Sequence, residues 1–346
     1  MRAKRRVGLS AKIRGRLDRH RANLRSRTYA TTAVNPPTAP RSDHVVTAVD
    51  GARLRVHSYG PADATAIVLV HGWTCAIEYW NAQINAFAGE YRVIAYDQRG
   101  HGQSEVGTAA LTMDLLADDL VAVLDATLSP RERAVLVGHS LGGMTLQAWA
   151  GRYPEQVATR AHAVLLTNTA ADRLVAETTV VPFFNRPLAF LRGRAIPLPF
   201  FIGRLGLGTP IFFPPLAPVR WLFARQIMSL AARRDLVDHS MAIVRSCRAW
   251  VRARFGFVLA DMNLGDAAKN LVVPTTILSG SADDMTPPVH SERIAAMLAE
   301  TGALVRHEVL ATGHLGNIEM YERFNEELAR VLDAVAATEE PVKAVG

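Results

Sequence analysis

The nine residues Val135–Gly143 read V-L-V-G-H-S-L-G-G and decide the fold of this chain. An apolar run typical of a buried strand leads into Ser140, and a helical run follows at once at Met144–Ala150. The pattern predicts a strand, a tight turn and a helix, with the serine at the apex of the turn.

The glycines on either side of the serine have a steric role in such a turn. A Cβ atom at Gly138 or Gly142 would collide with the strand or the helix, because the two elements approach each other closely. The strained turn lifts the Ser140 hydroxyl clear of the sheet. The backbone amides of Ser140 and Leu141 then lie at a helix N-terminus, where developing negative charge is favoured.

Length and composition indicate a globular protein with one large α/β domain and an insertion, or with two small domains. The chain has 346 residues, of which 49% are hydrophobic and 21% are charged. Its two cysteines, Cys75 and Cys247, suggest neither a disulfide framework nor a metal cluster, so we expect a reducing, cytoplasmic location. The sequence has no uncharged apolar run of the length that predicts a transmembrane helix.

The positive charge is concentrated at the N-terminus. Residues 1–30 hold eleven Lys and Arg against the single acid Asp18, which leaves 28 Lys and Arg and 31 Asp and Glu elsewhere. A body this close to neutral argues against a nucleic-acid-binding protein. Among the arginines, at helical spacing, lies an apolar stripe formed by Leu9, Ile13, Leu17 and Leu24. We expect either a solvated tail or an amphipathic helix in peripheral contact with a membrane surface.

Strands alternate with helices along the chain, which predicts an α/β fold with a mostly parallel sheet of about eight strands, flanked by helices. The expected strands are residues 45–49, 52–58, 66–70, 92–96, 135–137, 163–166, 275–279 and 303–310. The main expected helices are the stretch that follows Trp73 to about Phe87, and residues 111–128, 144–150 and 318–336. We divide the chain into a basic tail with a proline-containing linker (1–42), two core segments (43–170 and 274–337), an inserted helical cap (171–273) and a C-terminal tail (338–346).

The inserted segment, residues 171–273, differs in composition from the core. Eight of the twelve phenylalanines lie between Phe183 and Phe223, among clustered prolines. No acid occurs from Thr178 to Arg234, although eight arginines do. We expect a cap of proline-broken helices over the carboxyl ends of the strands, with an apolar ligand in the pocket beneath it.

A serine hydroxyl becomes a nucleophile when a base takes its proton and an acid orients that base. In a parallel sheet these groups belong on loops beyond the carboxyl ends of the strands. One later strand leads into Asp283 and Asp284, and the final strand leads into His314, so the chain order is Ser, Asp, His. The sequence shows no metal-spaced His/Cys set and no G-x-G-x-x-G after a strand, so we expect no cofactor and no metal.

Five short motifs occur in the chain, each at the end of an expected strand. They are H-G-W at 71–73, D-Q-R-G-H-G-Q-S at 97–104, G-H-S-L-G-G at 138–143, G-S-A-D-D-M-T-P at 280–287 and G-H at 313–314. In these motifs and their order, the chain from about Val45 to Ala336 resembles the α/β-hydrolase fold superfamily. The H-G-W loop also resembles that of bacterial serine esterases related to cofactor-free haloperoxidases.

The resemblance implies a role for each matching residue. Ser140 would be the nucleophile, His314 the base, and Asp283 the acid that orients the base. The backbone amides of Trp73 and Leu141 would form an oxyanion hole. The supporting residues would be His71, Gly72, Gly138, His139 and Gly142.

Two other carboxylates are candidates for the acid, and a further pair of charged residues has an expected structural role. Asp284 adjoins Asp283, but the spacing to the downstream proline favours Asp283. Asp172, after the preceding strand, is a further candidate for the acid. We expect Asp97 and Arg99 to form a buried polar pair that holds their loop.

Serine at position 140 excludes the branches of this superfamily that use a carboxylate nucleophile, the haloalkane dehalogenases and epoxide hydrolases. We therefore expect a carboxylic ester hydrolase that acts on an apolar or lipid-like ester through an acyl-enzyme intermediate. A perhydrolase or haloperoxidase, an acyltransferase and a C–C bond hydrolase are alternatives with the same three residues. An alternative of another class is a membrane-associated lipid- or partner-binding protein, with contact through residues 1–30 and the cap.

Overall fold

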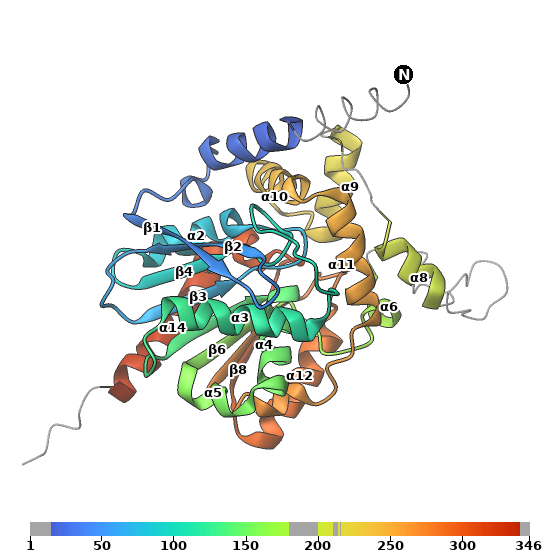
Figure 1. Cartoon of the computed structure of the whole chain (residues 1–346). Coiled ribbons are helices and arrows are strands. Elements are labelled where there is room, and N and C mark those ends of the chain that lie inside the picture. Colours follow the sequence, from blue (N-terminus) through green and yellow to red (C-terminus); the bar gives the residue numbers. More distant parts are fainter. Residues whose placement is uncertain (1–14, 180–199, 210–213, 215, 340–346) are drawn as a thin grey trace, which may run out of the picture.

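An eight-stranded sheet forms the centre of the molecule (Figure 1). The computed structural model describes residues 15–179, 200–209, 214 and 216–339. The strand order is β1-β2-β4-β3-β5-β6-β7-β8; the pairs β1–β2 and β2–β4 are antiparallel and the others are parallel, which confirms the predicted fold class. The strands are β1 (Arg41–Thr47), β2 (Arg53–Tyr59), β3 (Ala66–Val70), β4 (Arg92–Tyr96), β5 (Ala134–His139), β6 (Ala161–Thr167), β7 (Thr275–Gly280) and β8 (Leu304–Leu310).

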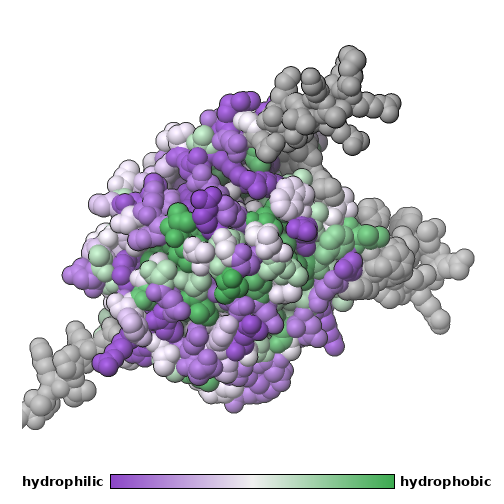
Figure 2. Space-filling model, viewed as in Figure 1, coloured by the Kyte–Doolittle hydropathy of each residue, from purple (hydrophilic) through white to green (hydrophobic). Residues whose placement is uncertain are grey.

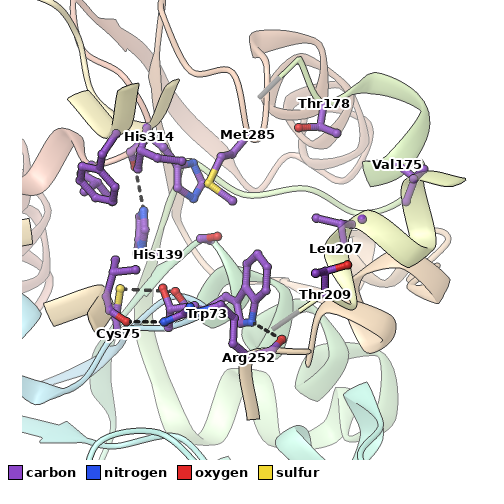
Figure 3. Close-up of a pocket in the computed structure, with 18 residues that line it drawn as sticks. Trp73, Cys75, His139, Val175, Thr178, Leu207, Thr209, Arg252, Met285 and His314 are labelled. Atoms are coloured by element: carbon purple, nitrogen blue, oxygen red, sulfur yellow. Dashed lines mark hydrogen bonds between the residues drawn. The ribbon is translucent and has the colours of Figure 1, made fainter. Parts of the chain in front are cut away.

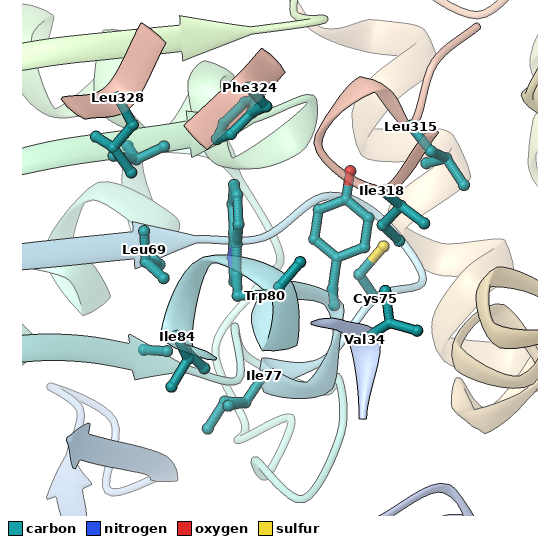
Figure 4. Close-up of a cluster of buried hydrophobic side chains, with 14 of the residues drawn as sticks. Val34, Leu69, Cys75, Ile77, Trp80, Ile84, Leu315, Ile318, Phe324 and Leu328 are labelled. Carbon is teal, nitrogen blue, oxygen red and sulfur yellow. The ribbon is translucent and has the colours of Figure 1, made fainter. Parts of the chain in front are cut away.

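Two hydrophobic cores lie on opposite faces of this sheet. Because side chains alternate along a strand, Leu69 of β3 enters one core and Val68 enters the other. In the first core, Trp80 lies close to Phe324, with ring centroids 6.2 Å apart (Figure 4). Helices that contribute to the first core include α2 (Asn81–Phe87) and α14 (Tyr321–Glu339). Those that contribute to the second include α3 (Met113–Thr127), α4 (Leu141–Arg152), α5 (Pro154–Arg160) and α12 (Pro288–Thr301).

The segment between β6 and β7 contributes a group of helices on one side of the sheet (Figure 1). The described helices are α6 (Leu174–Glu177), α8 (Phe200–Leu207), α9 (Ala217–Ile227), α10 (Arg234–Ser246) and α11 (Ala249–Asp261). Much of the expected Phe- and Pro-rich stretch, residues 180–199, 210–213 and 215, lies outside the described residues. Across the described ranges, the helices are either too short or too polar to cross a bilayer.

Residues 15–26 form a helix that lies against α10, which corrects the expectation of a solvated tail for this part of the chain. His20 donates from Nε2 to the carbonyl oxygen of Ala242 at 2.8 Å, and Arg21 donates from Nε to that of Ser246 at 3.0 Å. The last carbonyls of a helix have no partner inside it, so Arg21 satisfies one that α10 leaves open. The sequence could not identify this partner, which lies more than two hundred residues away.

Two expected helices are divided in the structure. Within residues 74–87, a 3-10 turn at Ile77–Trp80 precedes α2, and Gly72, just before this stretch, lies beside Ser140. Within residues 318–336, a short helix, α13 (Gly316–Glu319), is separated from α14 by Met320, whose φ of −124° and ψ of 53° are not helical. Both segments begin at or just after residues that line the cavity of Ser140 and His314, namely Trp73–Cys75 and Leu315, so tertiary packing there overrides the helical periodicity.

Candidate active site

Ser140 occupies the turn between β5 and α4 and has a strained backbone. Its φ of 51° lies in the left-handed region, which costs a non-glycine residue about 1–3 kcal/mol. A Cβ atom at Gly142 would lie 2.0 Å from the carbonyl oxygen of Val70, and one at Gly138 would lie 2.8 Å from the carbonyl oxygen of Gly142. Only glycine at these positions lets α4 start directly against the end of β3, which holds Ser140 at the apex.

Asp283 and His314 come from the loops after β7 and β8, and their side chains meet. Asp283 Oδ2 lies 2.8 Å from His314 Nδ1. The carboxylate also accepts hydrogen bonds from the backbone of Met285, from the side chain of Asn168, and from both the backbone and hydroxyl of Thr286. Burial favours the neutral acid, but His314 and these donors outweigh it and hold the pKa of Asp283 below its usual value. The ionised carboxylate therefore fixes a proton on Nδ1 and leaves Nε2 available.

The loop that carries His314 is held by the end of α9. The His314 N–H donates to the carbonyl oxygen of Ile227 at 2.8 Å. A Cβ atom at Gly313 would lie 2.4 Å from the backbone of Met228, and the Gly313 N–H donates to Glu319 at 3.0 Å. The inserted helices thus position the imidazole directly, which no motif in the sequence indicated.

Ser140 and His314 line the same cavity. In the described structure no hydrogen bond joins Ser140 Oγ to the imidazole of His314. Among the three side chains, the one hydrogen bond is therefore that between Asp283 and His314. A bond between a nucleophile and its base commonly shortens only in the complex with substrate.

Two backbone amides flank Ser140 from different elements. Leu141 is the first residue of α4, where N–H groups have no partner inside the helix. On the other side, a Cβ atom at Gly72 would lie only 3.1 Å from the Ser140 Cβ, which places the loop of Gly72 and Trp73 directly beside the serine. The Trp73 indole donates to the carbonyl oxygen of Arg252 at 3.2 Å, and this bond anchors the loop (Figure 3).

Two buried histidines brace these loops in the neutral form. His71 accepts from the Gln98 N–H at Nε2 and donates from Nδ1 to the Gly72 carbonyl oxygen, and burial lowers its pKa to about 4. His139 donates from Nε2 to the carbonyl oxygen of His314 at 2.8 Å (Figure 3). Burial, followed by the nearby charge of His314, lowers the pKa of His139 well below its usual value. Both rings therefore act as fixed hydrogen-bonding supports.

Lowering the pH from 6.5 towards 4.5 is expected to destabilise the fold steeply. Burial lowers the pKa of His71 to about 4 and the pKa values of His101 and His239 to about 3. In this window the unfolded chain binds more protons than the folded chain, so stability falls as the pH falls. The free energy of unfolding should drop by roughly 1 kcal/mol per pH unit for each of these histidines. Urea unfolding, followed by circular dichroism across this range, measures the slope.

The variant His239→Phe isolates one contribution to this slope. It keeps a ring against Tyr29, whose centroid lies 4.9 Å from that of His239. We expect it to remove about a third of the pH dependence contributed by the three histidines. A slope identical to that of the wild type would contradict a neutral, buried His239.

Asp97 and Arg99 do not pair with each other, which corrects the expectation from the sequence. Asp97 accepts from Arg55 at 3.0 Å and from backbone amides of two loops. Arg99 forms ion pairs with Asp119 at 2.6 Å and with Asp50 at 2.8 Å. The two side chains hold the same loop to different neighbours. Folding places Arg55 beside Asp97, and Asp50 and Asp119 beside Arg99, so the two residues do not pair with each other.

The two alternative acids lie away from the imidazole. Asp284 accepts a hydrogen bond from the Thr179 hydroxyl, and Asp172 pairs with Arg293 at 2.7 Å. Sequence reasoning missed Asn168 and Thr286, which hold the Asp283 carboxylate. In the sequence, Asn168 stands out only as a polar residue directly after a strand, and Thr286 only as a polar residue in a strand-end loop.

A largely apolar cavity of about 300 Å³ lies above Ser140 (Figure 3). It is lined from below by residues of the strand-end loops and from above by residues of α8, α9 and α10. Among the lining residues are Trp73, Cys75, Ser140, Val175, Leu207, Phe223, Ile227, Val244, Met285, His314 and Leu315. Arg252 also lines it and donates to the Val244 carbonyl oxygen at 2.9 Å. In the described part of the chain, no three metal-ligating side chains come together.

Comparison with known proteins gives consistent matches. A family model described as the alpha/beta hydrolase family matches residues 67–327. A bifunctional esterase/perhydrolase of Acinetobacter calcoaceticus is 30% identical over 275 residues, which are 76% of this chain and 90% of that protein. A 3-oxoadipate enol-lactonase of Acinetobacter baylyi is 26% identical, over 81% of this chain and 92% of that protein. Among solved structures, an esterase from Thermogutta terrifontis aligns with a TM-score of 0.66 at 23% identity, covering 86% of this chain and 99% of that one.

Proposed function

The chain belongs to the alpha/beta hydrolase family, and we propose that it is a serine hydrolase that cleaves carboxylic esters with apolar acyl groups. As a relative of esterases and other hydrolases, the protein is an esterase-like enzyme. One observation carries the finer proposal. Ser140, on its strained turn, lines the same cavity as His314, and His314 is hydrogen-bonded to the ionised Asp283.

In the proposed reaction, Ser140 Oγ attacks the ester carbonyl carbon and gives its proton to His314 Nε2. His314 passes this proton to the alcohol oxygen as the C–O bond breaks, and the acyl group stays on Ser140. A water molecule, deprotonated by His314, then attacks the acyl-enzyme and releases the acid. Asp283 remains ionised throughout and stabilises the imidazolium that forms in each half of the reaction.

The negative charge that develops on the carbonyl oxygen needs donors that are already in place. We assign this role to the backbone N–H groups of Trp73 and Leu141, which flank Ser140 from two separate elements. Donors of this kind are typically worth about a hundredfold or more in rate each, because they require no reorganisation during the reaction. The bond from the Trp73 indole to Arg252 and the hydrogen bonds of His71 keep the loop rigid.

The walls of the cavity suggest the substrate class. Leu207, Phe223, Ile227 and Val244 present hydrocarbon over Ser140, and the acyl chain of an apolar ester would bury its surface against them. Methylene groups buried in this way contribute about 0.8 kcal/mol each to transition-state binding.

With p-nitrophenyl esters of increasing acyl length, kcat/KM is expected to rise about two- to fourfold per methylene from acetate until the cavity is filled. The variant Leu207→Ala widens the cavity and should shift the optimum towards longer chains. Leu205→Ala is the matched control, because Leu205 lies on the same helix but is 57% exposed. A flat chain-length profile in the wild type would contradict an apolar acyl site.

A second candidate activity is perhydrolysis, and the similarity to an esterase/perhydrolase favours it. Here hydrogen peroxide, in place of water, would attack the acyl group on Ser140 and release a peracid. Formation of peracetic acid from acetate ester and hydrogen peroxide, measured alongside hydrolysis, tests this activity.

A further inference from the structure

Helix α9 has apolar side chains on two opposite faces. Its inner face carries Phe223 and Ile227, which line the cavity over Ser140. Its outer face carries Trp221 and Leu222, which are 58% and 51% exposed. An ordinary surface helix has one apolar stripe and a polar face opposite it, so this outer face is unusual.

The charges on α9 itself have one sign. Helix α9 contains no acid, and the exposed Arg225 stacks over the Trp221 ring at 5.9 Å. An indole beside an arginine is a combination suited to the interface between water and lipid, where the ring is half-buried and the cation meets phosphate.

A basic groove of about 180 Å³ lies between Arg27, just past the helix of residues 15–26, Arg220 of α9, and α10. Three arginines, Arg27, Arg220 and Arg245, line it together with one acid, Asp238, which pairs with Arg220 at 3.0 Å. Among the described residues, the buried Nε of Arg245 has no hydrogen-bond partner. The groove therefore holds more positive charge than its single acid neutralises, and an anionic group would fit it.

The lowered pKa of His20 agrees with an excess of positive charge in this groove. Burial is the largest cause that lowers its pKa, and the charges of Arg245, Arg21 and Arg27 lower it further.

Figure 2 shows hydrophilic residues covering the helix of residues 15–26, while hydrophobic residues gather lower on the same face, over β1 and α3.

We propose that the outer face of α9 and the adjoining basic groove dock this enzyme on an anionic phospholipid bilayer. Trp221 and Leu222 enter the interfacial region, and Arg225 and the arginines of the groove contact lipid phosphates. A second copy of the chain is a poorer occupant, because a two-fold contact would bring two basic faces together. The bilayer would then lie against the outer face of the helix whose inner face lines the cavity.

The test is co-sedimentation of the full chain with vesicles of phosphatidylcholine alone or with added phosphatidylglycerol. We expect binding to the mixed vesicles that falls with added salt, and weak binding to phosphatidylcholine alone. The double variant Trp221→Ser/Leu222→Ser should bind at least about tenfold more weakly, and Arg225→Glu should lose binding to a similar degree.

Matched controls change the same number of exposed apolar or charged side chains elsewhere on the chain. Val45→Ser/Val49→Ser removes two exposed apolar side chains near the β1–β2 turn, and Arg131→Glu reverses one exposed charge before β5, as Arg225→Glu does on α9. Both should bind like the wild type, within about twofold. Ser140→Ala should also bind like the wild type, so the proposal can succeed or fail independently of the hydrolytic mechanism.

Three results would overturn the proposal. One is the absence of wild-type binding to the anionic vesicles. Another is equal binding by Trp221→Ser/Leu222→Ser and the wild type. The third is a wild-type dimer in light scattering that Trp221→Ser/Leu222→Ser converts to a monomer, since that outcome assigns the face to a second copy of the chain.

Discussion

Replacement of Ser140 by alanine is expected to lower kcat for p-nitrophenyl butyrate by at least about ten-thousandfold, without unfolding the protein. The hydroxyl provides the bond to the acyl group, and neither His314 nor the flanking amides can substitute for it. Alanine retains a Cβ and leaves the backbone strain at φ 51° unchanged, so the fold should persist. Steady-state kinetics and labelling with a fluorophosphonate probe measure the loss.

Cys75 provides the control for this experiment, because it is another potential nucleophile that lines the cavity. Burial raises the pKa of its thiol well above the usual value, so the thiol stays protonated and unreactive at neutral pH. Cys75→Ala should keep activity within a few-fold of wild type and still take up the probe. If Ser140→Ala hydrolyses the ester at even a tenth of the wild-type rate, the proposed mechanism is wrong.

The substitution Asp283→Asn is expected to lower kcat by about ten-thousandfold, with a much smaller change in KM. The carboxylate accepts a hydrogen bond from His314 at 2.8 Å and fixes the proton on Nδ1; an amide can instead donate and stabilise the wrong tautomer. Asp283 acts through His314 and so is a positioning residue. Stopped-flow measurement of the acylation burst, alongside a thermal melt, separates slowed chemistry from a damaged fold.

The adjacent acid offers a close control. Asp284→Asn changes the same functional group one residue away, where the carboxylate accepts from the Thr179 hydroxyl and does not contact His314. It should retain activity within about threefold of wild type. Equal losses in Asp283→Asn and Asp284→Asn would point to a general disturbance of the loop, and a larger loss in Asp284→Asn would assign the acid to position 284.

The sheet and its helices could be predicted because their signals are local. Apolar runs at β3, β5 and β6 mark buried parallel strands, and the glycines around Ser140 mark the turn. The fold class is confirmed on this basis. The pairing of Arg99 was predicted wrongly, because its partners Asp50 and Asp119 come from segments that reach it only in the folded chain.

The surroundings of the candidate site were less accessible to sequence reasoning. The resemblance to a family selected Asp283 and His314, but it did not reveal that Asn168 supports the carboxylate or that the Ile227 carbonyl holds the histidine loop. The first contact joins two strand-end loops that are far apart in the sequence, and the second depends on how the inserted helix α9 packs on the core. Composition alone described that segment as apolar and basic, and it could not distinguish the inner from the outer face of α9.

The contact between the helix of residues 15–26 and α10 has a consequence for folding during synthesis. His20 and Arg21 bind carbonyl groups 222 and 225 residues further along the chain. At a typical rate of translation, roughly ten to forty seconds pass between the synthesis of His20 and Arg21 and the synthesis of the carbonyl groups that they bind. During that time the basic surface of the helix and the apolar side of Leu24 remain open to other molecules in the cell. This helix is thus synthesised long before it can reach its final place.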